Sequence, residues 1–216
     1  MPAFTIILPH KRNPLNDDAL QVCVDMLVRN TVNDFELLIS AAATPRPLFP
    51  AIDRLFRQAQ TDCLVFWNSD MFACPGWDVP MLALFDYGAI VTNILVEPGA
   101  ISMDGNNHHH DFGRRVETFR RAEFEAWSQS PEAPGTGNNE GWYAPYMISQ
   151  KRYLDIGGFD LDPADVRPAD GFNDRPLDID LFLKHKAQGG VVRRAKCYTY
   201  HLQRWSDPAE QTKGNR

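Results

Sequence analysis

The chain has 216 residues and a mass of 24.5 kDa, and 44% of its residues are hydrophobic, so it is long enough to bury the core of one globular domain. Its 28 acidic residues outnumber the 22 basic ones and give a net charge of −6, which disfavours a protein that binds nucleic acid chiefly by neutralising phosphates. The apolar runs are much shorter than the roughly 20 residues of a membrane span, and the N-terminus lacks a signal-peptide pattern, so we expect a cytoplasmic protein.

Short apolar segments alternate with helical patterns in the first half of the chain, which predicts βαβ units and a largely parallel sheet. We expect strands at residues 4–8, 35–40 and 64–67, the first ended by Pro9, and helices from about Asn16 to Asn30 and over 51–60. In open α/β sheets, ligands bind outside the carboxyl ends of the strands. Residues 10–13, 41–44 and 68–70 should therefore converge at one edge of the sheet.

The second half of the chain has a different character, with more Gly, Asn and His. We expect strands at residues 88–92, 143–149 and 191–200, helices at 115–129 and 177–188, and loops at 97–113 and 130–141. The four cysteines show no Cys-x-x-Cys spacing, which predicts buried free thiols instead of disulfides or a zinc site. Arg114-Arg115 and Arg120-Arg121 form either a solvated helix face or a small basic patch.

Two acidic positions have the chemistry of a catalytic site. Asp70, in Asn68-Ser69-Asp70, directly follows an apolar strand, where a carboxylate suits a divalent cation that also binds substrate phosphates. Asp178 lies at the start of a helix, where the backbone dipole favours the ionised carboxylate that accepts a proton from a hydroxyl. The alternatives are a structural turn for Asp70 and a helix-start acid for Asp178.

Other segments are ambiguous when taken singly. Gly157-Gly158 reads as a helix C-terminus with Phe159 packed inward, and His201 closes an apolar strand, where a histidine is either a ligand or a structural residue. The run His108-His109-His110 is either a polar loop or a contributor to a ligand site. Trp142 and the tyrosine that follows it are placed either to stack on a sugar or base or to pack in the core.

Taken in order, these pieces resemble the family 2 glycosyltransferases of the GT-A fold. The resemblance covers approximately residues 4–201 and rests on motifs in matching order. These are Thr5-Ile6-Ile7-Leu8-Pro9-His10-Lys11-Arg12-Asn13, Phe35-Glu36-Leu37-Leu38-Ile39, Asn68-Ser69-Asp70 with Pro75-Gly76-Trp77, Gly157-Gly158-Phe159-Asp160, and Leu177-Asp178-Ile179-Asp180-Leu181. It implies a single α/β domain at 1–206 with a GT-A-like (Rossmann-like), mostly parallel central sheet flanked by helices. It further implies a nucleotide-sugar-binding half at about 1–92 and an acceptor-binding half at 93–206, followed by a polar tail at 207–216.

The resemblance also implies an activity, a metal-dependent, inverting transfer of a sugar from a nucleotide-diphosphate donor to an acceptor hydroxyl. Asp178 would be the catalytic base, and Asp70 with His201 would hold Mn²⁺ or Mg²⁺. The implied donor-binding residues are Pro9, His10, Arg12, Asn68, Ser69 and Asp70, and those on the acceptor side are Trp142, Gly158 and Asp160. The acceptor is a saccharide, lipid-linked sugar, protein or small molecule, and the acidic charge makes a DNA base less favoured.

Two departures from the family pattern keep other functions open. Ala41-Ala42 stands where the family has an aspartate pair that contacts the nucleotide base, and Leu177 replaces the glutamate before the catalytic aspartate. A catalytically silent sugar-nucleotide-binding protein is therefore one alternative. A nucleotidyltransferase on a related fold is another, although the glycine-rich, lysine-containing loop of such enzymes is missing after Leu8.

Overall fold

The computed structural model describes residues 1–12, 14–42, 48–99, 108–136, 140–159 and 177–202, which form one α/β domain. The elements follow in the order β1 (Phe4–Lys11), α1 (Pro14–Asn30), β2 (Phe35–Ala42), α2 (Leu48–Gln58), β3 (Cys63–Phe66), β4 (Met71–Ala73), α3 (Asp78–Leu84), β5 (Ala89–Glu97), β6 (His108–His109), the 3-10 turn η1 (Val116–Thr118), α4 (Arg121–Ser128), β7 (Tyr146–Ser149), α5 (Gln150–Asp155), α6 (Leu177–Ala187) and β8 (Val191–His201). No helix within these ranges is both long and apolar enough to cross a membrane.

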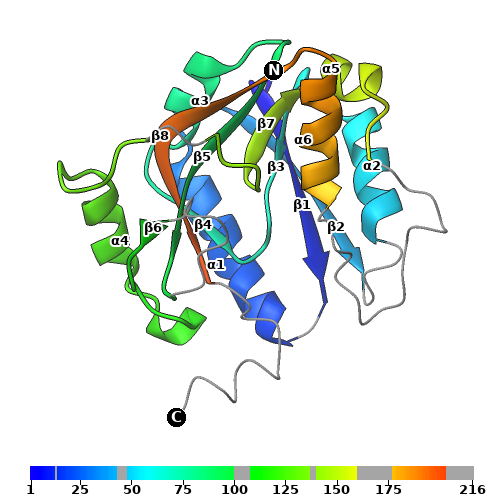
Figure 1. Cartoon of the computed structure of the whole chain (residues 1–216). Helices are drawn as coiled ribbons and strands as arrows, with labels where there is room; N and C mark the ends of the chain where they lie inside the picture. Colours follow the sequence, from blue (N-terminus) through cyan, green and yellow to red (C-terminus); the bar gives the residue numbers. More distant parts are fainter. Residues whose placement is uncertain (13, 43–47, 100–107, 137–139, 160–176, 203–216) are drawn as a thin grey trace.

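The strands form one sheet in the order β2-β1-β3-β7-β5-β8-β4, with β6 paired to β5 (Figure 1). The sheet is mixed, so the expectation of a mostly parallel sheet holds only in part: β1 is parallel to β2 and β3, and β5 to β6 and β8, but β7 is antiparallel to both its neighbours and β4 is antiparallel to β8. The composition of a short apolar strand such as β7 does not indicate its direction in the sheet. That direction depends on how the chain connects the strand to its neighbours.

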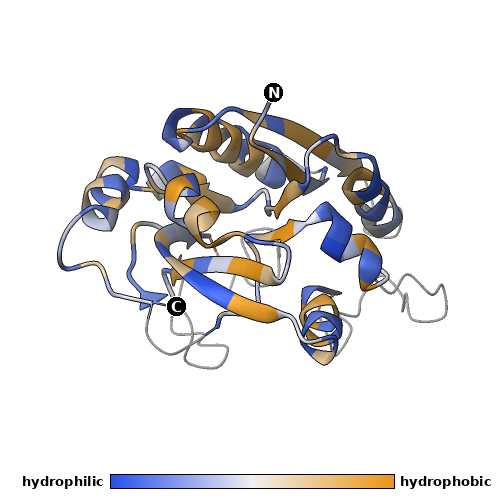
Figure 2. Ribbon diagram, turned by 90° about the horizontal axis from the view of Figure 1, so that it is seen from above, coloured by the Kyte–Doolittle hydropathy of each residue, from blue (hydrophilic) through white to orange (hydrophobic). Residues whose placement is uncertain are grey.

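Apolar side chains cover both faces of the sheet, since successive residues of a strand point to opposite sides. On one face, Phe66 packs among aromatic rings of α2, β7 and α5, including Phe56 and Tyr146. On the other, Trp67 packs against Trp77, 4.7 Å between ring centroids. Figure 1 shows α2, α5 and α6 grouped on one side of the molecule, with α1 and α4 towards the other, and Figure 2 shows hydrophobic residues running through the central strands.

The segment from Pro75 to Asp78 fixes the connection between α1 and β2. Gly76 has a φ of 67°, and its N–H donates to the Asn30 carbonyl at 2.7 Å. The fully buried Asp78 carboxylate accepts hydrogen bonds from the backbone N–H groups of Val32 and Asn33 and from the Asn33 amide. In this chain, Pro75-Gly76-Trp77 and the aspartate after it thus have a structural role.

Several predicted boundaries are wrong. Pro9 does not end β1, which continues to Lys11, because β1 pairs only with β2 beyond Ile7 and the missing N–H of proline therefore breaks no bond to β3. The helix expected at 115–129 begins only at Arg121, after η1. The strand expected at 88–92 runs to Glu97, and β4 and α3 were not predicted. The inward packing of Phe159 and the four buried free thiols are confirmed within the described residues.

Candidate functional site

Five parallel strands end at one edge of the sheet. Because β7 runs opposite to β3 and β5, the carboxyl ends of β1, β2, β3, β5 and β8 and the beginning of β7 share this edge. In Figure 1 the edge faces downward, where the arrowheads of β1 and β2 point. Among the described residues, the polar positions that follow these strands therefore lie at one edge of the sheet, as the sequence predicted.

At this edge, His201 lies between two carboxylates. Its Nδ1 is 2.8 Å from Oε1 of Glu97, and its Nε2 is 3.5 Å from Oδ2 of Asp70. The Glu97 side chain is only 4% exposed, whereas those of His201 and Asp70 are 20% and 27% exposed. We call these three residues the carboxylate–histidine cluster, whose solvent-facing side is formed by His201 and Asp70.

The backbone around Asp70 sets the geometry of this cluster. Met71 pairs with His201 across β4 and β8, and the Leu202 N–H donates to the Asp70 carbonyl at 3.1 Å. The preceding turn is closed by two further bonds, from the Met71 N–H to the Asn68 carbonyl at 3.2 Å and from the indole N–H of Trp67 to the Met71 carbonyl at 2.9 Å. Asp70 is therefore held by the strand register and not only by its turn.

The charged groups of the cluster shift each other's pKa values towards the ionised forms. Burial by itself lowers the pKa of His201, but the carboxylates of Asp70 and Glu97 overcome this effect and raise it to about 10. Burial disfavours ionisation of Asp70, yet the neighbouring imidazolium of His201 gives the carboxyl a pKa below its usual value. The neighbouring carboxylates therefore favour the protonated form of His201, and the protonated ring favours the ionised form of Asp70.

Asp178, in the first turn of α6, has a different environment. Burial raises the pKa of its carboxyl to about 6, partly offset by hydrogen bonds from backbone amides that include Ile179 and Ala144, and the charge of Asp180 raises it further. The Ala144 contact places Asp178 against the segment that leads into β7. Since β7 begins at the edge where β3 ends, Asp178 belongs to the same edge as the cluster.

The predicted donor-binding residues have different surroundings. Asn68 and Ser69 lie half-buried in the turn before Asp70, and Arg12 is exposed after β1. His10 is 3% exposed, and its Nε2 is 2.6 Å from Oδ1 of Asp17 in α1, so α1 fixes its ring. The structure thus brings Asn68 and Ser69 next to Asp70, whereas His10 is engaged by a helix. Pro9, which pairs with Ser40, is half-buried and has no polar side chain.

Two of the predicted acceptor-side residues, Trp142 and Gly158, contact α6. The Trp142 ring stacks on Phe182 and its indole N–H donates to Glu140 at 2.9 Å, so contacts within the fold hold this side chain in place. Gly158, with a φ of 65°, passes so close to Tyr153 that a Cβ would lie 2.9 Å from the phenol ring. Asp160 lies outside the described residues. An acceptor role for these residues remains a prediction.

The histidine run is ordered by aromatic packing. His108 and His109 form β6 beside the end of β5, and the rings of His108 and His110 pack on Trp127, with centroids 5.5 and 5.1 Å apart. His110 also stacks on Phe112. This packing accounts for two of the three rings without a ligand.

The basic residues near η1 and α4 are paired with acids. Arg120 contacts Glu123 at 2.8 Å, Arg121 lies between Asp25 and Glu125, and Arg114 lies 3.5 Å from Asp111. Such exposed pairs contribute little stability, but they reduce the positive field of the patch. This arrangement favours the solvated face over a patch for a polyanion.

Two residues of the site were missed from the sequence. Glu97 was placed at the start of a loop because residues 97–113 are rich in Gly, Asn and His, although the apolar run 94–96 signals that the strand extends to it. Tyr146 was placed on a strand, but no sequence signal shows that its hydroxyl is buried beside Asp178. The positions of both residues in the site depend on strand register, which a single sequence does not determine.

Asp70 and His201 could supply only some of the ligands that a divalent cation needs. Glu97 engages Nδ1 of His201 and leaves Nε2 directed at Asp70, the arrangement by which a carboxylate orients a metal-binding histidine. Among the described residues, no group of three or more acidic, His or Cys side chains is suited to hold a metal ion. Asp70 and His201 therefore match a cation whose other ligands are substrate phosphate oxygens and water.

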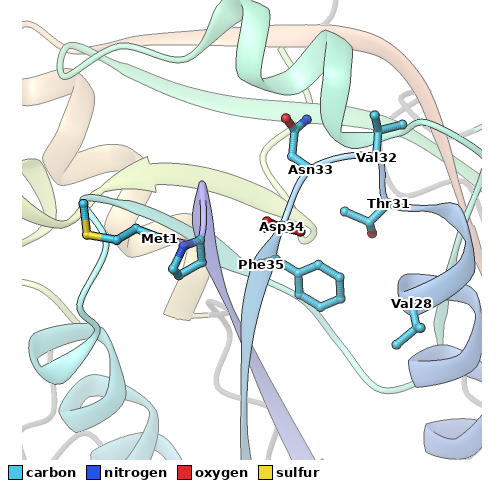
Figure 3. A pocket seen from close by; sticks show the side chains of 8 residues that line it. Met1, Val28, Thr31, Val32, Asn33, Asp34 and Phe35 are labelled. Atoms are coloured by element: carbon cyan, nitrogen blue, oxygen red, sulfur yellow. The ribbon is translucent and has the colours of Figure 1, made fainter.

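A surface cavity of about 530 Å³ lies away from this edge, at the end of α1 and the start of β2 (Figure 3). Its lining includes Met1, Val28, Val32, Asp34 and Phe35. It is open to solvent and contains no residue of the carboxylate–histidine cluster.

Comparison with known proteins gives no assignment. No family model matches the sequence, and no curated protein matches it either. Function is therefore argued from the site alone.

Proposed function

We propose that the chain is an inverting glycosyltransferase that moves a sugar from a nucleotide-diphosphate donor to an acceptor hydroxyl with the help of a divalent cation. The observation that carries this proposal is the position of two chemically different sites at one sheet edge: the carboxylate–histidine cluster, and the carboxyl of Asp178, whose pKa is raised to about 6. Transfer to a hydroxyl needs both, since the leaving diphosphate must be stabilised and the attacking oxygen must lose a proton.

Asp70 and Nε2 of His201 are the groups that would hold the cation on the donor side, and because only a neutral imidazole can bind a metal, cation binding would release the Nε2 proton of His201. The cation, Mn²⁺ or Mg²⁺, supplies neutralisation of the negative charge on the diphosphate leaving group. Glu97 orients His201 through Nδ1, and the half-buried turn of Asn68 and Ser69 lines the same side. A cation between the carboxylate of Asp70 and a diphosphate would remove the repulsion between these two negative groups.

On the acceptor side, Asp178 would take the proton of the attacking hydroxyl. With a pKa of about 6 the carboxyl is mostly ionised at neutral pH, and it is a stronger base than an ordinary aspartate. The proton goes to a carboxylate oxygen as the acceptor oxygen bonds to the anomeric carbon and the diphosphate leaves. Asp178 then releases the proton to solvent.

One observation favours a second candidate, a sugar-nucleotide-binding protein without turnover. Ala41, at the end of β2, is exposed and carries no carboxylate with which to read a base. Donor binding would then be measurable, but no transfer would follow.

Turnover tests the proposal. Purified protein is incubated with a panel of nucleotide sugars and Mn²⁺, with and without mixed acceptors, and released nucleoside diphosphate is measured. Asp70→Asn and Asp178→Asn are assayed in parallel, and Asp34→Asn, an exposed acid at the opposite edge, is the matched control. We expect release by the wild type and the control and a loss of at least about 100-fold in Asp178→Asn. Binding without release from any donor would favour the second candidate, and neither binding nor release would overturn both.

A further inference from the structure

The hydroxyl group of Tyr146 stands out among the buried tyrosines. Tyr146 is 0% exposed, and within the described residues its hydroxyl has no hydrogen-bond partner. By contrast, the hydroxyl of the equally buried Tyr200 donates to the Gly113 carbonyl at 2.6 Å and accepts from the Phe112 N–H at 3.1 Å. A buried polar group without a partner is unfavourable, and a phenylalanine at position 146 would avoid it.

The ring of Tyr146 has little freedom to move its hydroxyl elsewhere. It is stacked on Phe66 with centroids 5.3 Å apart and meets Phe182 of α6 edge-on, also at 5.3 Å. Tyr146 pairs with Phe66 and Thr92 on neighbouring strands and so lies at the edge where Asp178 begins α6. The hydroxyl is thereby fixed in the environment of the Asp178 carboxylate.

The carboxylate of Asp178 acts electrostatically on the hydroxyl of Tyr146. Burial and the negative charge of Asp178 both raise the pKa of Tyr146, so the phenol stays protonated and remains a hydrogen-bond donor. The other groups that face this pair are Asp180 on α6, which raises the pKa of Asp178, and Tyr153 on α5, which raises that of Tyr146. The amides of Ala144 and Ile179 also donate to the Asp178 carboxylate.

We propose that Tyr146 is a positioning residue for Asp178, and that its hydroxyl donates a hydrogen bond to one ordered water which in turn donates to the ionised carboxylate. A water with these two partners satisfies the buried hydroxyl and keeps the carboxylate oriented. The inference rests on the proposed function in that Asp178 is the base of the reaction. The role of the Tyr146 hydroxyl is to stabilise the charged form of Asp178 without touching the substrate.

The test compares Tyr146→Phe with the wild type in the full chain. The pKa of the Asp178 carboxyl is followed by ¹³C NMR, with Asp178→Asn to assign the resonance, and thermal unfolding is recorded on the same samples. We expect Tyr146→Phe to raise this pKa by at least about half a unit, roughly threefold in the acid dissociation constant. Because a higher folded-state pKa of Asp178 lowers stability above that pKa, the melting temperature of Tyr146→Phe at pH 7.5 should fall slightly. Tyr200→Phe should also melt lower, but it should leave the Asp178 pKa unchanged.

An unchanged Asp178 pKa in folded Tyr146→Phe would overturn the proposal. Tyr146→Leu, which also lacks the hydroxyl, provides a second variant that should shift the pKa in the same direction. In a transfer assay, the acidic limb of the pH profile should move with the NMR value. If the wild type transfers no sugar, the proposed function fails, but the NMR titration still decides whether Tyr146 and Asp178 are coupled.

Discussion

The carboxylate of Glu97 holds Nδ1 of His201 at 2.8 Å, and this contact directs Nε2 of the same ring towards Asp70. Glu97 is almost completely buried at the end of β5, whereas His201 ends the neighbouring parallel strand β8. The orientation of the imidazole is therefore determined inside the protein, and only its far nitrogen is available to a ligand.

Replacing Glu97 should weaken cation-dependent nucleotide binding without abolishing it. Glu97→Gln keeps the size of the side chain but loses the charge that fixes the ring, and loss of such outer contacts typically reduces metal affinity about 10–100-fold. Calorimetric titration of nucleoside diphosphate in the presence of Mn²⁺ measures the change. Glu123→Gln, on the exposed face of α4, is the control, and equal affinity in the two variants would argue against the role of Glu97.

Asp78 should be important for stability and not for binding. Its buried carboxylate accepts three hydrogen bonds from Val32 and Asn33, so Asp78→Ala removes all three from the connection after α1 and should cost about 3 kcal/mol of unfolding free energy. Urea denaturation measures this loss, with Asp34→Asn expected to change stability by less than about 0.5 kcal/mol. A small effect of Asp78→Ala would show that the connection after α1 is held in another way.

The raised pKa of Asp178 also predicts how stability depends on pH. The folded-state pKa of about 6 exceeds the ordinary value of 3.8, so the stability from this group is fully present below pH 3.8 and is lost as pH rises through 6. At pH 7.5, Asp178→Asn should therefore be more stable than the wild type, by up to about 3 kcal/mol, and the difference should shrink towards pH 4. Denaturation of both proteins at the two pH values checks this. A variant that is less stable than the wild type at pH 7.5 would mean that the carboxylate is well solvated or paired.

Much of the site was accessible from the sequence because it depends on local patterns. An apolar strand followed directly by Asn68-Ser69-Asp70, and a helix beginning near Asp178, both placed acids at the edge of the sheet that forms the candidate site. The sequence did not reveal that β7 is antiparallel or that Glu97 reaches His201. Both depend on how strands far apart in the chain pair, and the single sequence contains no direct record of that pairing.

The central claim is that this edge binds a nucleoside diphosphate through a divalent cation held by Asp70 and His201. Its most direct test is a calorimetric titration of the wild type and Asp70→Asn with uridine, guanosine, cytidine, thymidine and adenosine diphosphates, each with Mn²⁺ and then with EDTA. The account predicts that at least one nucleotide binds the wild type in Mn²⁺, and that EDTA and Asp70→Asn each weaken this binding by at least about tenfold, or 1.4 kcal/mol. Equal affinity with Mn²⁺ and with EDTA, or no binding of any of the five nucleotides, would contradict it.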